Sequence, residues 1–418
     1  MMHLLIAETQ GGFFLQVMQK EYLTPQYIRQ FQCTGAACED TCCSLWEITI
    51  DQLTYEKYKQ IPDTSLHKEI NKNLVRNHKS KESYASFKMN QKTGNCSMLC
   101  DGLCTIQAKV GETFLSQTCS TYPRILNEAD EIEVSALLSC PEIARLVLLS
   151  EDAMNFTRTH ELHTPNLRIN PLGSLTDKKK LCIQNLRDIT LEVLSDRQFS
   201  LQHRLIIIGV LMDNTDELLR SGAYDNVLSF LDEFRGELVT NEELRNYGVF
   251  PSDDQIQFQI LNNTLMAHLS EFLWNARYNE CMNEYLTGIQ SNGSSLSESL
   301  HTYRSVREQI YEPYLREKEF IFENYVINHV YQNFMTDIYA GGSLFDFFVK
   351  LVADCSFIRL HLIGMAAYRQ ELTDDMVVKL IQSYTKNYKF SNKFLNAILK
   401  DIKDQGYYSL GGMSLLIK

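Results

Sequence analysis

The placement of cysteine constrains this chain more than any other feature. The stretch CTGAACEDTCC, at residues 33–43, holds four cysteines within eleven residues. Nine of the twelve cysteines precede residue 141, and they are Cys33, Cys38, Cys42, Cys43, Cys96, Cys100, Cys104, Cys119 and Cys140. Cys182, Cys281 and Cys355 lie singly in apolar segments, where cysteine is usually a small buried hydrophobe. The fold must therefore accommodate many thiols in its N-terminal third.

The rest of the sequence predicts a cytoplasmic protein whose thiols stay reduced. The start MMHLLIAETQGG lacks a basic segment, and its apolar run ends at Glu8, so it is a poor secretory signal. The longest apolar stretch, LIIIGVLM at 205–212, is far shorter than the ~20 residues that span a bilayer. A net charge of −12 argues against a nucleic-acid partner. Clustered cytoplasmic thiols point to metal binding or catalysis rather than disulfides.

Beyond the cysteines, hydrophobic periodicity predicts helices. The helical pattern occurs at 176–194, 199–212, 223–234, 255–276, 315–334 and 374–384. Thr373 is a candidate N-cap, and Pro313 suits the first turn of a helix. We expect a mainly α-helical fold in which an irregular cysteine-rich N-terminal module with little β structure packs on a helical C-terminal region. The expected division is an N-terminal extension at 1–17, a cysteine-rich module at 18–150 and a helical region at 151–418.

The cysteine spacing indicates which thiols can approach one another. Cys38 and Cys42 share one face of a helical turn, whereas Cys43 is rotated about 100° from Cys42. The adjacent pair therefore tends to point in two directions. Farther along, the turn signal at 101–102 would fold Cys96 back near Cys104.

Spacing alone leaves the identity of a metal centre open. Structural zinc sites commonly use paired thiols or Cys/His pairs, but no C-x2-C occurs and no histidine lies between residues 79 and 159. Iron–sulfur clusters also take four thiolates and tolerate irregular spacing. An iron–sulfur cluster and an irregular all-thiolate zinc site both fit, and reactive or merely buried thiols are lesser alternatives.

The order of the cysteine blocks resembles one protein family. C-x4-C-x3-C-C at 33–43 is followed by NC…LCTIQ at 95–107, TCSTYPR at 118–124 and SCPE at 139–142. This order is similar to that of the bacterial flagellin lysine-N-methylases, which belong to a wider group of zinc- or iron-chelating cysteine-cluster proteins. The resemblance covers about residues 22–146, with a weaker echo in IFENYVINHVYQNF at 321–334. Carried over position by position, it implies eight metal-ligating residues: Cys33, Cys38, Cys42, Cys43, Cys96, Cys104, Cys119 and Cys140. Cys100 departs from the pattern and is left out.

The resemblance implies transfer of a methyl group from S-adenosylmethionine to lysine ε-amines of flagellin, with an iron–sulfur centre taking part. We expect a [4Fe–4S] cluster on four of the eight thiols, and the surplus leaves room for a second centre such as zinc. The usual donor-binding motifs are missing, because the sequence has neither a Rossmann-type glycine loop nor a C-x3-C-x2-C triplet. A non-enzymatic metal-chelating or protein-binding module with the same cysteine framework is therefore the alternative.

A lysine methyltransferase must also deal with a protonated amine. At pH 7 roughly one lysine in 2,500 is neutral, which corresponds to about 4.6 kcal/mol. Aromatic walls desolvate an amine and hold a methylated cation. The aromatic segment at 303–334 makes Tyr325 and Tyr331 candidate substrate-binding residues, with ordinary core packing as the competing interpretation. We expect the active cleft where the cysteine module meets the helical region. Arg124 suits either a carboxylate or phosphate ligand or a structural ion pair.

Overall fold

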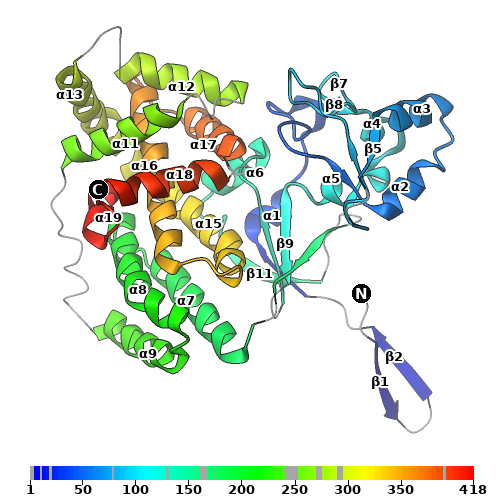
Figure 1. Ribbon diagram of the computed structural model, residues 1–418, viewed down its shortest axis with the longest axis horizontal. Helices are drawn as coiled ribbons and strands as arrows, with labels where there is room; N and C mark the ends of the chain where they lie inside the picture. Colours follow the sequence, from blue (N-terminus) through cyan, green and yellow to red (C-terminus); the bar gives the residue numbers. More distant parts are fainter. Residues whose placement is uncertain are drawn as a thin grey trace.

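A computed structural model describes residues 4–9, 12–17, 21–77, 80–128, 131–160, 167–173, 175–240, 253–269, 275–289, 295–388 and 392–418. The fold is mainly α-helical, as the periodicity predicts. The long helices lie on the left of Figure 1, whereas strands and short helices make up most of the N-terminal part to the right. None of the helices in these ranges is long and apolar enough to cross a membrane.

Every strand in the described ranges lies before residue 172. The strands are β1 (Leu4–Thr9), β2 (Gly12–Val17), β3 (Tyr22–Pro25), β4 (Thr49–Ile50), β5 (Leu74–Arg76), β6 (Ala85–Phe87), β7 (Leu99–Cys100), β8 (Leu103–Cys104), β9 (Arg124–Glu128), β10 (Ile132–Ala136), β11 (Phe156–Thr159) and β12 (Ile169–Pro171). The helices among them are α1 (Gln26–Gln30), α2 (Gln52–Tyr58), α3 (Thr64–Asn73), α4 (Thr105–Val110), α5 (Gln117–Thr121) and α6 (Pro141–Leu148), with 3-10 turns η1 (Gly35–Ala37) and η2 (Glu112–Phe114).

A five-stranded mixed sheet lies where the N-terminal part meets the long helices (Figure 1). Its order is β11-β3-β10-β9-β12, in which β9 and β10 form an antiparallel hairpin and β3 runs parallel to β10. Leu126, Ile132 and Val134 of this sheet are buried in the same core as the long helices. The sequence does not predict this sheet, because strands of three to five residues that pair with distant segments leave no periodic signal.

The other short elements form a small lobe, residues 44–121, on the right of Figure 1. An antiparallel sheet of order β4-β6-β5 and the β7–β8 hairpin pack with α2–α5. Its hydrophobic core is separate from that of the long helices and contains Ile50, Tyr58, Leu66 and Phe87. The turn predicted at 101–102 is confirmed, since Asp101 and Gly102 have the positive φ angles of 49° and 79° that such hairpins need.

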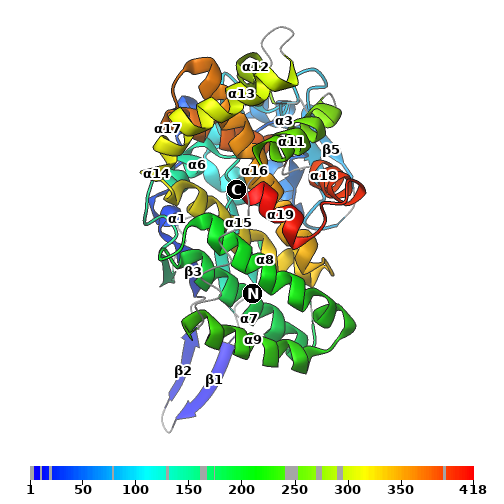
Figure 2. The ribbon, with the colours of Figure 1, turned by 90° about the vertical axis from the view of Figure 1, so that its left-hand side faces the viewer.

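The C-terminal region consists of helices with one shared core. These are α7 (Asp177–Ser195), α8 (Leu201–Ser221), α9 (Tyr224–Thr240), α11 (Asp254–His268), α12 (Ala276–Ile289), α13 (Leu296–Val306), the π-helical turn η5 (Arg307–Tyr311), α14 (Glu312–Arg316), α15 (Phe320–Tyr339), α16 (Leu344–Arg369), α17 (Asp374–Tyr388), α18 (Asn392–Asp404) and α19 (Leu410–Ile417). Figure 2 shows α7–α9 as one tier and α11–α13 as another, with α15 and α16 between them. The central helix α16 packs against α8, α12, α15, α17 and α19.

Several predicted helix boundaries are confirmed, and one helix is corrected. The Thr373 hydroxyl accepts the Met376 N–H at 3.4 Å, as an N-cap does, and Pro313 lies in the first turn of α14. The single helix predicted over 315–334 is instead two, because α14 ends at Arg316 and α15 begins at Phe320. The stretch predicted over 255–276 includes 270–274, which lie outside the described residues.

Candidate metal centre and neighbouring cavities

Seven of the eight predicted ligand thiols line one cavity of about 370 Å³. This thiol cavity is bordered by Cys33, Cys38, Cys42, Cys43, Cys104, Cys119 and Cys140. The eighth, Cys96, is 5% exposed and lies beside the cavity, where its backbone N–H donates to the Cys43 carbonyl at 2.7 Å. Cys100, which falls outside the family pattern, is exposed on the β7–β8 hairpin and does not line the cavity. Four separate chain segments thus bring their thiols to one place.

Helix N-termini hold two of these thiols. Cys104 and Cys140 are the N-cap residues of α4 and α6, which places them beside the N–H groups that a helix start leaves open. Burial raises the pKa of Cys140 to about 12, and hydrogen bonds from the Ile143 and Glu142 N–H groups oppose that rise. The pKa of Cys104 is likewise raised by burial and lowered by backbone N–H donors. Donors of this kind favour a thiolate once a cation compensates for burial.

The charge state of Cys42 affects the pKa values of several neighbouring thiols. A hydrogen bond with Cys43 and desolvation raise its pKa well above the ordinary value. In turn, its charge would raise the pKa values of Cys96, Cys104 and Cys119, for each of which burial is the larger cause. The thiols are therefore close enough that ionising one opposes ionising the next. A metal centre would remove that conflict, because bound thiols are deprotonated and their charge is compensated.

The thiols surround a space rather than converge on one point. Within the described ranges, no group of three or more His, Cys, Asp or Glu side chains is arranged to hold a single metal ion. A tetrahedral zinc site needs each sulfur about 2.3 Å from one centre.

Buried hydroxyls accompany the thiols. Ser120 lines the thiol cavity, and its Oγ is buried without a hydrogen-bond partner among the described residues. Ser97 and Thr105 carry buried hydroxyls in the same condition, and each of the three residues directly follows a predicted ligand thiol. The repeated Cys-Ser or Cys-Thr pair is a signal that the sequence offered and that motif matching missed.

One arginine also lines the thiol cavity. The Arg124 guanidinium lies 4.9 Å from the Phe31 ring centroid, and Arg124 has no ion-pair partner within the part of the chain that the structure describes. Burial lowers the pKa of Arg124, while Glu112, Cys140 and Cys33 act in the opposite direction. Of the two interpretations of Arg124, this position suits a ligand anion better than a structural ion pair.

A buried ion pair joins the thiol loop to the helical region. Asp40, between Cys38 and Cys42, accepts hydrogen bonds from Lys386 Nζ at 2.6 Å and from Gln382 Nε2 at 2.9 Å. The Lys386 side chain is 3% exposed and also donates to the Thr41 carbonyl. Both partners lie on α17, which therefore holds the thiol loop in place. We call this contact the Asp40–Lys386 latch.

A second cavity, of about 130 Å³, lies where α15, α16 and α17 meet the N-terminal part. This junction cavity is lined by Leu138, Tyr325, Asn328, His329, Gln332, Asn333, Asp337, Phe347, Lys350, Asp354, Tyr384, Thr385, Tyr388 and Leu395. Leu138 borders it while Cys140 borders the thiol cavity, so the two cavities flank one turn of the chain. Because Leu138 and Cys140 are two residues apart in the sequence, their Cα atoms are at most about 7 Å from each other.

The two predicted substrate-binding tyrosines lie in different places. Tyr325 lines the junction cavity, and burial, with the nearby Asp354 carboxylate, raises its pKa well above the usual value. Tyr331 packs against Phe156 of β11 at a centroid distance of 4.5 Å. Its hydroxyl donates to the Leu23 carbonyl at 3.1 Å. The structure thus does not bring Tyr325 and Tyr331 into one cavity.

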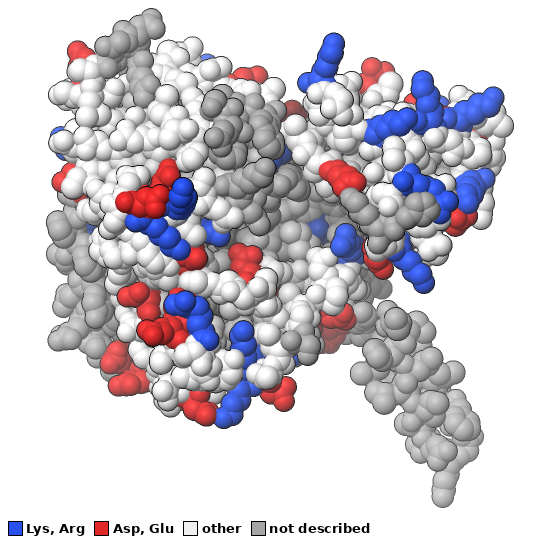
Figure 3. Space-filling model, viewed as in Figure 1, with Lys and Arg blue, Asp and Glu red and all other residues white. Residues whose placement is uncertain are grey.

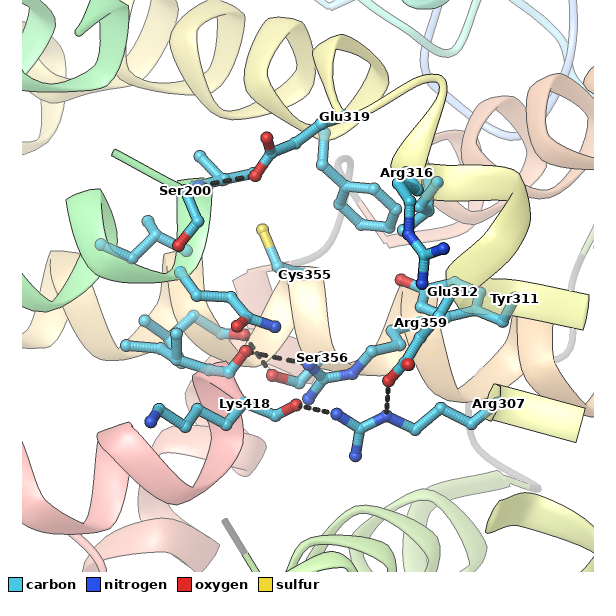
Figure 4. Close-up of a pocket in the computed structure, with 17 residues that line it drawn as sticks. Ser200, Arg307, Tyr311, Glu312, Arg316, Glu319, Cys355, Ser356, Arg359 and Lys418 are labelled. Atoms are coloured by element: carbon cyan, nitrogen blue, oxygen red, sulfur yellow. Dashed lines mark hydrogen bonds and ion pairs between the residues drawn. The ribbon is translucent and has the colours of Figure 1, made fainter. Parts of the chain in front are cut away.

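A third cavity, of about 500 Å³, lies among the helices and is shown in Figure 4. Its cationic side chains include Arg307 and Arg359, and both already have partners. Arg359 donates to the Ile417 and Leu416 carbonyls at the end of α19, and Arg307 pairs with Glu312 at 3.0 Å and with Asp254. The Arg359 bonds satisfy carbonyl groups that the end of α19 leaves open, and the Arg307 bonds are ion pairs within the helical region, so both arginines have a structural role. We call this third cavity the arginine cavity.

Charge is distributed unevenly between the two regions. The small lobe has ten basic and eight acidic residues, a net charge of +2, whereas the whole chain carries −12. Figure 3 shows lysine and arginine side chains gathered over the lobe on this face, and acidic and basic side chains side by side over the long helices. The acidic excess therefore belongs to the rest of the chain.

Comparison with known proteins supplies a family. Residues 187–416 match the model of the FliB lysine N-methylase C-terminal domain. A lysine-N-methylase from Salmonella typhimurium is 35% identical over 132 residues, which is 31% of this chain and 33% of that protein. The flagellar biosynthetic protein FliU from Salmonella muenchen is also 35% identical over 132 residues, and the match covers 78% of its length. The matched part thus spans about a third of the curated lysine-N-methylase. No solved structure matches the chain.

Proposed function

This chain belongs to the FliB lysine N-methylase family, and we propose that it methylates lysine ε-amines of flagellin. The family resemblance seen in the cysteine blocks is thereby confirmed. We propose S-adenosylmethionine as the donor and a [4Fe–4S] cluster as the resident cofactor. In the net reaction the lysine nitrogen gains a methyl group and loses a proton, while the sulfonium loses its S–CH₃ bond and leaves as S-adenosylhomocysteine. The observation that carries the proposal is the single cavity bordered by seven thiols.

The residues of the thiol cavity fit an iron–sulfur cluster. The thiolates of a cluster bind different iron atoms, so they surround a volume, whereas the ligands of one zinc ion converge on a point. The cavity thiols surround about 370 Å³, which also lies within the range of roughly 300–1,000 Å³ typical of cofactor sites. Ser120 lines this cavity and has a buried hydroxyl without a partner among the described residues, which suits a hydrogen bond to a cluster sulfur. Because eight thiols exceed the four that one cluster needs, we also propose that the remaining thiols can hold a second centre, such as zinc.

The residues that line the thiol cavity then have distinct roles. Four of the thiols hold the cluster, and the N–H groups at the starts of α4 and α6 stabilise negative charge on Cys104 and Cys140. When bound, the cluster would supply one-electron chemistry and an iron atom for ligands. Arg124, held over Phe31 without an ion-pair partner among the described residues, binds the carboxylate of the donor.

The proposed partner is flagellin, because one relative is named a flagellar biosynthetic protein and others are named lysine-N-methylases. The negative charge outside the small lobe suits a lysine-bearing surface. We therefore propose that flagellin approaches the helical region, in the cytoplasm, at a rate that falls with added salt.

A non-enzymatic metal-binding or protein-binding module is the second candidate. The sequence has no known donor motif, which favours it. The two candidates differ in one measurable product, a methylated lysine.

Anaerobic purification followed by iron, sulfide and zinc analysis tests the cofactor. Incubation with flagellin and S-adenosylmethionine carrying a deuterated methyl group tests the activity, read as labelled methyl steps on lysine peptides. We expect iron and sulfide in cluster proportions and labelled flagellin. Full zinc occupancy without iron would overturn the cluster, and unlabelled flagellin with cluster-loaded protein would favour the non-enzymatic module.

The donor site is tested by Arg124→Gln, with Arg316→Gln as the matched control. Arg316 is an exposed arginine on the rim of the arginine cavity. Binding of S-adenosylmethionine should weaken at least tenfold in Arg124→Gln and stay unchanged in Arg316→Gln. The reverse result would place the donor in the arginine cavity.

A further inference from the structure

We propose that the arginine cavity binds a small organic carboxylate with an apolar body, whose anionic group is recognised by Arg359 and Arg316. The volume of about 500 Å³ lies within the roughly 300–1,000 Å³ typical of small-molecule sites. This ligand is distinct from the methyl donor, which we place in the thiol cavity. The site therefore stands or falls independently of the methyltransferase function.

Arg359 brings a buried positive charge to the cavity wall. It is 7% exposed, and its Nη1 and Nη2 atoms donate to the Ile417 and Leu416 carbonyls. These carbonyls are neutral groups, and the end of a helix carries only roughly half a negative charge, so they compensate the guanidinium in part. Within the ranges that the structure describes, no carboxylate pairs with Arg359. A buried charge is costly without a counter-ion, so this position favours an anion from outside the chain.

The Nε atom of Arg359 is a second, independent observation. It is buried and has no hydrogen-bond partner among the described residues, although buried N–H groups almost always have an acceptor. Burial raises the pKa of the neighbouring Tyr303, and Arg359 opposes that rise. The Tyr303 hydroxyl donates to Gln257 at 3.0 Å, so it carries its proton and supplies no negative charge. An anion beside Arg359 would bring both a counter-charge and further acceptor atoms.

The carboxylates that line the cavity are engaged elsewhere. Glu312 accepts from Arg307 Nε at 3.0 Å, and Glu319 accepts the Leu201 N–H at the start of α8 at 2.7 Å. Figure 4 shows both interactions as dashed lines at the edge of the space. Neither side chain is therefore the counter-ion of Arg359.

Arg316 is the cation at the mouth of the cavity. It is exposed on α14 and has no hydrogen-bond or ion-pair partner in the part of the chain that the structure describes. Figure 4 shows its side chain extending from α14 toward Glu312 and Arg359. A guanidinium in this place attracts an anion to the entrance and can bind a carboxylate through two N–H groups.

The rest of the wall is largely apolar, which selects the body of the ligand. The apolar side chains that line the cavity are Leu201, Leu205, Tyr311, Leu315, Phe322, Val352 and Ile417. Cys355 is partly exposed, and Figure 4 shows its sulfur pointing into the space. Such walls gain free energy from burying an apolar body, whereas nucleotides and sugar phosphates need many polar partners. The cavity therefore suits a carboxylate with a hydrocarbon body.

Binding of octanoate to the protein purified with its metal centre, measured by calorimetry, tests the site without any methylation. 1-Octanol has the same hydrocarbon chain without the charge, and acetate has the charge without the chain. Alkylation of Cys355 by N-ethylmaleimide, read from peptide masses, reports whether octanoate enters this cavity. Cys100, exposed on the β7–β8 hairpin, is the internal control.

Four variants test the residues. Arg359→Gln removes the buried charge, and Arg359→Lys keeps it. Arg316→Gln removes the charge at the mouth, and Arg29→Gln is its matched control, because Arg29 is an exposed arginine on α1 outside the cavity. Cys355→Phe fills the space into which the sulfur points.

We expect octanoate to bind, and 1-octanol and acetate to bind at least tenfold more weakly. Octanoate should slow alkylation of Cys355 and leave that of Cys100 unchanged. Arg359→Gln should weaken octanoate binding at least tenfold and Arg359→Lys much less, because only the first variant leaves the anion without its buried partner. Arg316→Gln should weaken it about threefold, in a salt-dependent way, while Arg29→Gln has no effect. Should the Arg359 variants fail to fold, Arg316→Gln and Cys355→Phe carry the test.

Three results would overturn the proposal. The first is octanoate that does not bind, or that binds wild type, Arg316→Gln and Cys355→Phe equally well. The second is equal binding of 1-octanol or of acetate, which would remove the need for the charge or for the apolar body. The third is displacement of octanoate by S-adenosylmethionine, which would give this cavity to the methyl donor. Failure to label flagellin, with octanoate bound as expected, would defeat the methyltransferase function and leave the carboxylate site standing.

Discussion

The small lobe and the helical region solve the problem of stability in different ways. The helical region buries a continuous core around α16, with Phe334, Phe348 and Phe357 among its fully buried side chains. The lobe has only short elements around a minor core that itself includes Cys96, and partly buried Cys43, Cys104 and Cys119 pack against that core. Small cores usually need disulfides or a metal. The thiols of the lobe would therefore serve both its stability and its chemistry.

Metal removal should produce the largest difference between the two regions. Because a metal centre couples ligand binding to folding, the apo-protein should lose amide protection over residues 44–121 while the long helices keep theirs. Hydrogen exchange read by mass spectrometry, with and without an iron chelator, measures this. Cys119→Ser should have a similar effect and abolish methylation, and Cys100→Ser, outside the cavity, is the control. Uniform protection in the apo-protein would mean that the lobe is stable on its own.

Breaking the Asp40–Lys386 latch should have the next largest effect on stability. Lys386→Met leaves a carboxylate at 15% side-chain exposure without its cation, and breaking a buried pair costs about 3–5 kcal/mol. We expect that loss of unfolding free energy in urea, with increased exchange of the 33–43 loop. Asp40→Asn in the same background should recover part of it. The exposed pair Lys178–Asp225, at 2.8 Å, is the matched control and should matter far less. Equal effects for the two pairs would contradict a buried latch.

Acid should weaken the helical region through one buried histidine. Burial lowers the pKa of His361 to about 4, while its Nδ1 lies 2.6 Å from the Phe357 carbonyl and its Nε2 2.9 Å from the Tyr278 hydroxyl. Between about pH 6.5 and pH 4, His361 binds a proton in the unfolded chain but not in the folded chain. The free energy of unfolding therefore falls as pH falls. The loss should approach about 3 kcal/mol at pH 4. His361→Gln should reduce the change of unfolding free energy with pH, measured by denaturant titrations at several pH values. If that change stays the same, other groups cause it.

These two regions also differ in how far their sequence predicts them. Amphipathic helices carry a local period, and the boundaries at Thr373 and Pro313 follow from capping and from the fixed φ of proline, so the helical region could be predicted. The five-stranded sheet could not, because its pairing depends on segments far apart in the chain. The grouping of the thiols followed from motif order, whereas Arg316 and Arg359 look like ordinary charged helix residues until α14, α16 and α19 are packed together.

The smallest expected effect separates the two tyrosines that the sequence singled out. Tyr331→Phe removes one hydroxyl bonded to the Leu23 carbonyl, at the contact between α15 and the sheet, and should cost about 1 kcal/mol of stability. Tyr325→Phe removes a hydroxyl near Asp354 in the junction cavity, where the predicted substrate contact of Tyr325 would be made, so it should raise the KM for flagellin more than it lowers the melting temperature. Steady-state methylation kinetics beside thermal unfolding of both variants measure the contrast. If Tyr331→Phe raises KM as much as Tyr325→Phe does at equal stability, then Tyr331 also contacts the substrate and the lysine must reach the sheet side of α15.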